Sequence, residues 1–211
     1  MALVKYPDGS YREIGEKNQT KKARNLTKSR LGIDFETAIN ESNEYYLEKG
    51  IAAIYKKPTP VQIVKVDYPA RNKARITEAY YKTPSTTDYN GIYRKSYIDF
   101  EAKSCKESNF SFERIYEHQI KHLENIYELG GISFIIVEFS TLHEIYILPT
   151  PLLTIKHDEA LNGGRKSIPY EYFKENGYLV ETGFKPRINY LKTVDKIYFE
   201  EKKYLKKNDE D

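Results

Sequence analysis

The sequence predicts a mixed α/β domain built around a central β-sheet. The periodicity changes along the chain from a helical segment to several extended segments, then to a second helical segment and further extended ones. The stretch "ISFIIVEFS", residues 132–140, is apolar almost throughout, which is typical of a central strand covered on both faces. A chain of 211 residues is long enough for one domain with a substantial core.

The predicted domain begins with a helix over residues 33–50. Asp34 lies near the start of this helix and Gly50 ends it. Residues 51–58 and 61–69 then predict two strands, the second with only partial alternation of apolar and polar side chains.

A hairpin is expected next. The chain stays extended from Arg75 to a break at Pro84, and we expect it to reverse at Asn90-Gly91, because glycine adopts positive φ without strain. Residues 96–104 form the returning strand. Alternation along it places Tyr97, Asp99, Glu101 and Lys103 on one face and Ile98, Phe100 and Ala102 on the other.

The second half of the domain begins with a long predicted helix over 109–131. Asn109 or Ser111 would cap this helix, and a Gly-Gly pair would end it. The apolar strand follows, and residues 144–149 are expected to pair with it. The remainder from residue 159 onward predicts a helix, a loop and a closing helix over 191–204.

Positive charge is concentrated in two segments. The formal net charge is only +3, but residues 5–30 carry eight Lys/Arg against three acids, and residues 49–82 carry eight against two. Two basic segments on an acidic remainder suggest a localised surface for a polyanion. The alternative is ordinary solvated lysines.

Composition also sets limits on location and boundaries. No apolar run approaches the length of a membrane span, the start lacks the apolar stretch of a signal peptide, and the single cysteine excludes an internal disulfide, so we expect a cytoplasmic protein without a membrane partner. We expect a basic, disordered tail at 1–30, a domain at 31–205 and a charged end at 206–211.

Asp88, Glu101 and Lys103 form the strongest chemical pattern. Glu101 and Lys103 share a strand face, and hairpin pairing could bring Asp88 close to Glu101. Neighbouring carboxylates repel each other, and Mg²⁺, which prefers oxygen ligands, relieves that repulsion. The adjacent lysine could activate water and stabilise a phosphorane-like transition state. A surface acid beside a solvated Glu–Lys pair is the alternative.

Other candidates carry weaker signals. Gln119 interrupts an apolar helical stripe and is expected to face polar groups, either a metal's water shell or backbone. His118 and His122 have the spacing of a zinc helix but no third ligand, so we reject zinc. Residues 162–166, "NGGRK", lack the remaining positions of a phosphate-binding loop. Glu36 is either a surface residue or an outer carboxylate of the site.

Residues 56–82 predict a projecting, basic, two-stranded stalk. Their prolines are awkward in a central sheet, whereas basic and aromatic side chains suit phosphates and exposed bases. An edge hairpin protected by lysines is the alternative. The candidate DNA-binding residues are Lys56, Lys57, Lys65, Arg71, Lys73, Arg75, Tyr80 and Tyr81.

Five segments together resemble one known family. "ESNEYY", "KKPTPVQIVKVDYPAR", "EAYYKTPSTTDYNGIY", "YIDFEAK" and "HQIKH" occur in the order and at the spacings of RecU-type Holliday-junction resolvases of bacteria. The resemblance runs from about residue 30 to the C-terminal helix and is most specific over 40–122. It implies a restriction-endonuclease-like fold with a mixed central sheet flanked by helices, a protruding stalk and a homodimer.

The resemblance also implies roles for individual residues. Asp88 and Glu101 would bind Mg²⁺ (Mn²⁺ could substitute), Thr86 and Gln119 would complete the metal site, and Lys103 would stabilise the transition state. Glu36 matches the family's first-helix acid, which adds it to the catalytic candidates. Arg71 matches a position used for contacts with DNA and recombinase.

The implied activity is cleavage of four-way DNA junctions by paired symmetric nicks in recombination and repair of DNA damage. Strand annealing and modulation of the RecA recombinase would accompany it. The chain departs from the family pattern at Ser104-Cys105, where Glu-Thr is common, and around Glu36. Two rival readings stay open: a non-catalytic DNA-binding or annealing regulator of recombinase, and a general nuclease that cuts linear duplex equally well.

Overall fold

The computed structural model describes residues 3–5, 11–13, 34–70, 73–81 and 86–201. The chain divides into two units, residues 1–37 and 38–211, which are considered separately. In the first unit, β1 (Leu3–Lys5) and β2 (Tyr11–Glu13) pair antiparallel, a pairing that the expectation of a disordered tail did not include.

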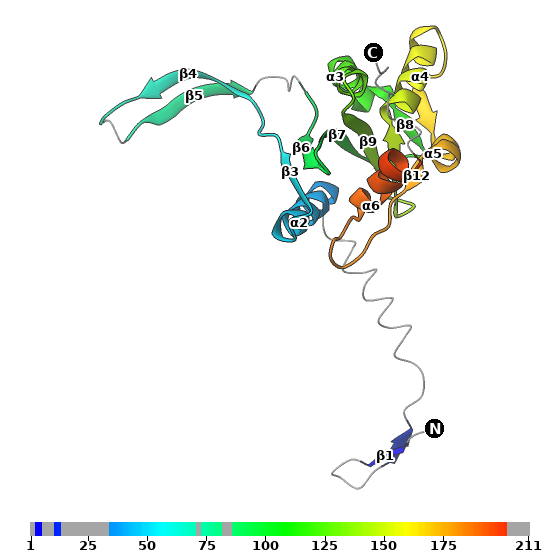
Figure 1. The fold of residues 1–211 in the computed structure, drawn as a ribbon. Coiled ribbons are helices and arrows are strands. Elements are labelled where there is room, and N and C mark those ends of the chain that lie inside the picture. Colours follow the sequence, from blue (N-terminus) through cyan, green and yellow to red (C-terminus); the bar gives the residue numbers. More distant parts are fainter. Residues whose placement is uncertain (1–2, 6–10, 14–33, 71–72, 82–85, 202–211) are drawn as a thin grey trace. The chain divides into compact units, whose positions relative to one another are not determined.

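A six-stranded sheet forms the centre of the second unit (Figure 1). The strand order is β12-β10-β9-β7-β6-β3, with β7 and β9 parallel and the other neighbours antiparallel. The predicted mixed sheet is therefore confirmed. Its strands are β3 (Ala52–Lys56), β6 (Tyr89–Tyr93), β7 (Ser96–Cys105), β9 (Ile132–Phe139), β10 (Glu144–Pro149) and β12 (Tyr178–Leu179).

Helices flank this sheet, as predicted. The parallel pairing of β7 with β9 requires a crossover, which α3 (Glu117–Glu128) provides. Helices α3 and α4 pack on each other and on β9, and α5 packs on β10 (Figure 1). The other helical segments are α2 (Phe35–Glu48), α4 (Thr150–Leu161), α5 (Tyr170–Asn176), α6 (Tyr190–Val194) and a π-helical turn (Asp195–Glu200).

Three stacked aromatic rings set the register of the central strands. Tyr89 on β6 stacks on Phe100 of β7 with ring centroids 5.0 Å apart, and Phe100 stacks on Phe134 of β9 at 4.9 Å. All three are fully buried. Because a slip of one residue would turn every side chain of a strand to the other face, this ladder fixes which polar residues meet on the opposite face.

The predicted reversal at Asn90-Gly91 is wrong. Both residues lie inside β6, and the chain turns at Arg94 and Lys95, which have φ of 46° and 67°. Gly91 is required for space, since a Cβ there would lie 2.0 Å from the carbonyl oxygen of Ala53 on β3. Glycine at position 91 therefore reflects the close approach of β3 and β6 and does not mark a turn.

The predicted helix over 109–131 is wrong in its first third. Residues 109–111 form β8 (Asn109–Ser111), which pairs antiparallel with β11 (Ser167–Pro169), and a short 3₁₀ turn follows before α3. Pairing with a segment far away in sequence overrides the helical signal at residues 109–111, and Ser111 caps the 3₁₀ turn instead of a long helix. Helix α4 was not predicted, and the closing helix is confirmed in outline by α6 and the π-helical turn, which begin at Tyr190.

Strands β4 (Val61–Asp67) and β5 (Arg75–Tyr81) form a separate two-stranded ribbon (Figure 1). Their register is interrupted between Ile63 and Val66, a bulge that increases local twist. Nearly every side chain of both strands is exposed. A ribbon that buries so little contributes little to stability, so its exposed side chains are available to a partner.

Within the described part of the chain, no helix combines the length and apolar character needed to cross a membrane.

Candidate active site

Two adjacent strands bring the predicted carboxylates together. The register that pairs Tyr89 with Phe100 leaves Asp88, which directly precedes β6, beside Glu101 of β7. The backbone N–H of Asp88 donates a hydrogen bond of 3.0 Å to Oε2 of Glu101. In return, Oδ2 of Asp88 accepts one of 3.3 Å from the backbone N–H of Ala102. Each carboxylate is thereby tied to the other's strand.

Glu101 is fully buried and is held by two further side chains. Its Oε1 accepts a hydrogen bond of 2.8 Å from Nε2 of Gln119 and lies 2.5 Å from Nζ of Lys103. The oxygen of Gln119 accepts from the backbone N–H of Tyr116 at 3.1 Å, which anchors the amide at the first turn of α3. Gln119 therefore orients Glu101 through its amide hydrogens, while its predicted role as an oxygen ligand stays a prediction.

Burial first, and then the charge of Asp88, raise the pKa of Glu101 from 4.5 to about 7. Lys103 and Gln119 act in the opposite direction. A buried, ionised carboxylate next to another acid is costly, and a bound cation would remove most of that cost. The pair therefore fits a hard divalent ion such as Mg²⁺, which commonly takes one or two carboxylates.

Two further residues, Thr86 and Glu36, are predicted to belong to the site. Thr86 is half-buried and precedes Asp88 by two residues. Glu36 lies in the first turn of α2, in the unit that ends at residue 37, so its catalytic role stays a prediction. Across the described residues, no three Asp, Glu, His or Cys side chains gather into a metal-binding group. The structure thus brings together Asp88 and Glu101, while the ligand roles of Thr86 and Gln119 stay predictions.

A second buried carboxylate was not recognised from the sequence. Asp99 is fully buried, and it shares the strand face of Glu101, a position that alternation had indicated. Its partners are Nζ of Lys57 at 2.8 Å, the hydroxyl of Tyr97 at 2.9 Å, Nε2 of His122 at 3.1 Å and the hydroxyl of Thr87. These residues form what we call the Asp99 cluster.

The two histidines of α3 do not converge. His122 belongs to the Asp99 cluster, whereas the ring of His118 stacks on Tyr116 with centroids 5.3 Å apart. The two histidines have the spacing of a zinc-binding helix, but each contacts a different set of residues.

The predicted DNA-binding residues fall into three groups. Lys57 is turned toward Asp99, while Arg71 lies outside the described residues. The others are exposed, and Tyr80 and Tyr81 are 62% and 84% exposed. The exposed members are Lys56, Lys65, Lys73, Arg75, Tyr80 and Tyr81.

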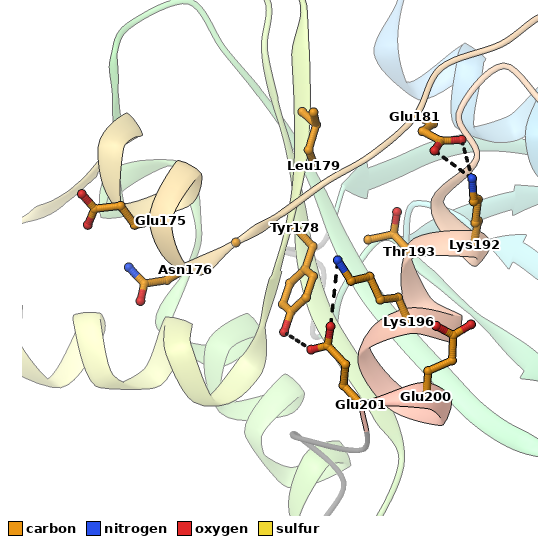
Figure 2. A pocket seen from close by; sticks show the side chains of 11 residues that line it. Glu175, Asn176, Tyr178, Leu179, Glu181, Lys192, Thr193, Lys196, Glu200 and Glu201 are labelled. Carbon is orange, nitrogen blue, oxygen red and sulfur yellow. Dashed lines mark hydrogen bonds and ion pairs between the residues drawn. The ribbon is translucent and has the colours of Figure 1, made fainter.

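A hollow near the C-terminal end of the described chain lies apart from all of these residues. Its volume is about 550 Å³, and it is lined by side chains of α5, β12, α6 and the π-helical turn (Figure 2). Lys192 pairs with Glu181 at 2.8 Å and Lys196 with Glu201 at 3.9 Å, so both lysines of the lining are paired with an acid. Its lining contains none of the predicted site residues.

A comparison with known protein families shows to which family this chain is related. Residues 30–196 match the family model described as RecU, Recombination protein U. The chain belongs to the RecU family. That assignment confirms the resemblance inferred from the five sequence segments.

Curated members of the RecU family are similar over nearly their whole length. A protein of Lactococcus lactis subsp. lactis (strain IL1403), named Holliday junction resolvase RecU, is 46% identical, and the alignment covers 92% of this chain and 98% of that protein. A protein of the same name from Geobacillus sp. (strain WCH70) is 46% identical over 93% of this chain and 98% of its own length. A third protein of this name, from Pediococcus pentosaceus, is 48% identical, and the alignment covers 91% of this chain and 96% of that protein.

A solved structure of Archaeoglobus fulgidus Hjc, described as a Holliday junction resolvase from an archaeal hyperthermophile, was also matched. It is 12% identical with a TM-score of 0.30, covering 54% of this chain and 77% of that one. A likeness this weak supports no conclusion about the RecU chain.

The raised pKa of Glu101 predicts how stability depends on pH. A carboxyl whose folded pKa exceeds its unfolded value binds its proton more tightly when folded, so stability falls as pH rises from 4.5 to about 7. Without divalent ions, Asp88→Asn should be more stable than wild type at about pH 8, by roughly 1 kcal/mol, because it removes a like charge beside Glu101. The difference should shrink toward pH 4.5.

Urea unfolding at both pH values measures this effect, with the exposed Asp158→Asn as the charge-matched control. Added Mg²⁺ should stabilise the wild type more than Asp88→Asn. Equal stability of the two proteins at high pH would contradict the electrostatic account of the pair.

Proposed function

We propose that this protein is a Mg²⁺-dependent endodeoxyribonuclease that resolves four-way (Holliday) DNA junctions by paired symmetric nicks during recombination and repair in the cytoplasm. The observation that carries the proposal is the meeting of Asp88, Glu101 and Lys103 on adjacent strands, with Glu101 buried and oriented by Gln119. The names of the similar RecU proteins support the choice of substrate.

Asp88 and Glu101 would hold the Mg²⁺, and the RecU resemblance adds Thr86 and Gln119 as further oxygen ligands. For Gln119 that role would require its amide oxygen to leave the backbone N–H of Tyr116. When bound, the ion would polarise the scissile phosphate and lower the pKa of a coordinated water. Mn²⁺ could take the same oxygen ligands.

The chain's own groups would orient and stabilise the reacting atoms. Lys103, 24% exposed at its side chain and 2.5 Å from Glu101, would position the attacking water and stabilise negative charge as it develops on the phosphate. In-line attack would leave a 5′-phosphate and a 3′-hydroxyl. Gln119 would keep Glu101 from rotating away, and the Asp88 and Ala102 backbone hydrogen bonds would hold the strands in register.

A homodimer would place two such sites on one junction. Each subunit would supply one complete site, and two-fold symmetry would match two opposed cuts on strands of like polarity. This part of the proposal rests on the RecU family resemblance and on the symmetry of the substrate.

The deciding experiment compares cleavage of a synthetic four-way junction and of linear duplex of the same sequence, with Mg²⁺ and with EDTA. We expect Mg²⁺-dependent symmetric nicks in the junction and little cutting of the duplex. Equal cutting of both substrates would identify a general nuclease, and binding without any cutting would identify the non-catalytic regulator.

The exposed ribbon of β4 and β5 is proposed as the main DNA contact. Lys73→Ala/Arg75→Ala should weaken junction binding about tenfold and reduce the slope of log K against log salt by about 2, since each residue would neutralise one phosphate. Both side chains are exposed, so folding should be unaffected. Fluorescence anisotropy at several salt concentrations measures this, with the exposed Lys121→Ala of α3 as control, and an unchanged slope would contradict the proposal.

The exposed tyrosines of the same ribbon favour an additional role in strand annealing. Tyr80 and Tyr81 could stack on unpaired bases without regard to sequence, which is what annealing requires. Modulation of the RecA recombinase would use the same ribbon, with Arg71 as the residue that the family resemblance singles out. Annealing rates of Tyr80→Ala/Tyr81→Ala against wild type test the first of these roles.

A further inference from the structure

Asp99 is buried next to the candidate active site but takes no part in the Asp88–Glu101 pair. A fully buried carboxylate is unfavourable unless its oxygens are paired and hydrogen-bonded. The Asp99 cluster meets this requirement with four side chains, contributed by four different parts of the chain. Among these four, Lys57 carries a full positive charge and therefore contributes most to neutralising Asp99.

Lys57 contacts the Asp88 segment twice. Its backbone N–H donates to the carbonyl oxygen of Asp88 at 2.7 Å. Its ammonium donates to the hydroxyl of Thr87 at 2.9 Å and to Oδ2 of Asp99 at 2.8 Å. The side chain is only 20% exposed, unlike that of the neighbouring, exposed Lys56. Lys57 therefore contacts both Asp88, the proposed metal ligand, and the residue before it, Thr87.

The place of these residues in the chain explains why such a contact is needed. Lys57 directly follows β3, where the chain leaves the sheet for the β4–β5 ribbon, and Thr87 lies where it returns. Asp88 directly precedes β6, whose ladders with β3 and β7 begin at Tyr89, so Asp88 lies outside the regular strand pairing. Its carboxylate accepts one hydrogen bond from Ala102 of β7, at 3.3 Å, and the Lys57 contacts restrain the same segment from the β3 side.

We propose that Lys57 is a positioning residue, which acts through Asp99 to hold residues 86–88 against β7 and so fixes Asp88 beside Glu101. The inference deepens the proposed function and rests on it. It replaces the sequence-based expectation that Lys57 binds DNA directly. Misplacement of a catalytic group by about 1 Å can lower a rate roughly 100-fold, so the contact matters for chemistry and not only for folding.

The test uses Lys57→Met, which keeps most of the side-chain length and removes the charge. We expect single-turnover junction cleavage at saturating enzyme to fall about 10- to 100-fold. Junction affinity, measured by anisotropy without divalent ions, should stay within about twofold of wild type. Amide hydrogen exchange should accelerate in the peptide covering residues 86–93, a readout that needs neither metal nor activity.

Two further variants show whether Lys57 acts through Asp99. Lys57→Met/Asp99→Asn should cleave no more slowly than Lys57→Met alone, because residues of one network are not additive. Thr87→Val, a milder change, should reproduce the same pattern with a smaller effect if Lys57→Met proves unstable. Lys121→Met removes an exposed charge from α3 and should leave cleavage, affinity and exchange unchanged.

Two results would overturn the inference. Wild-type cleavage and exchange in Lys57→Met would show that the contact positions nothing. A loss confined to junction affinity would assign Lys57 to DNA binding instead. If the wild type itself cut no junction, the proposed function would fail, while faster exchange of residues 86–93 in Lys57→Met would still support the positioning contact.

Discussion

Replacing Asp88 with Asn is expected to abolish junction cleavage while leaving junction binding intact. The substitution keeps an oxygen that can accept the hydrogen bond from Ala102, so the strand contact survives. It removes the charge that Mg²⁺ requires, and loss of such a group should slow cleavage by on the order of 10³-fold or more, about 4 kcal/mol. Binding without divalent ions should be unchanged or tighter, since one charge that repels phosphate is gone.

Glu101→Gln should also abolish cleavage, but with a structural cost. Glu101 accepts hydrogen bonds from the Asp88 backbone, Gln119 and Lys103, and an amide offers only one oxygen to these three donors. A donor left unsatisfied in this buried site should destabilise the protein by about 1–3 kcal/mol.

Single-turnover cleavage and junction affinity should therefore be measured for both variants together with thermal unfolding. Asp158→Asn, an exposed acid on α4, is the matched control and should behave as wild type. Cleavage by purified Asp88→Asn at more than a few per cent of the wild-type rate would remove Asp88 from the proposed mechanism.

Replacing Gly91 with Ala is expected to have the largest effect on folding. A Cβ at this position would lie 2.0 Å from the carbonyl oxygen of Ala53 and 2.6 Å from Cα of Ile54. Both atoms belong to the backbone of β3 and cannot turn away, so β3 and β6 would have to separate. We expect a cost of roughly 3 kcal/mol or more, in the range of severe overpacking with loss of ladder hydrogen bonds.

Gly163→Ala separates crowding from backbone strain. Gly163 has φ of 87° and open space around it, so alanine there should cost only about 1 kcal/mol. Urea unfolding of the two variants compares the costs directly. Gly91 has no such positive φ, so destabilisation no larger than that of Gly163→Ala would contradict the crowding of residue 91 by β3.

The local sequence pattern correctly predicted those elements whose structure depends mainly on neighbouring residues. The apolar run at 132–140 became the central strand β9, and Gly50 ended helix α2 with φ of 64°. Alternation along 96–104 correctly grouped Asp99, Glu101 and Lys103 on one face of β7. These features follow from period and propensity, which act over a few neighbouring residues.

Gly91 shows where local pattern is ambiguous. A glycine can mark positive φ or lack of space, and a single sequence does not distinguish the two. The turn at Arg94 and Lys95 carries no glycine, so propensity favoured the wrong position. Asn109 is a second example. Asparagine favours helix N-caps, but Asn109 instead lies in β8 and pairs with Pro169 of β11.

The sequence alone predicted a mixed α/β fold around a central sheet, a basic two-stranded segment, and Asp88, Glu101 and Lys103 as the candidates for chemistry. Only the tertiary structure decided what Lys57 contacts, because its sequence neighbourhood is the same as that of exposed Lys56. The physical reason is that burial and charge pairing depend on groups distant in the chain. Asp99 meets Lys57 and His122 through the packing of β7 with β3 and α3, which no local pattern encodes.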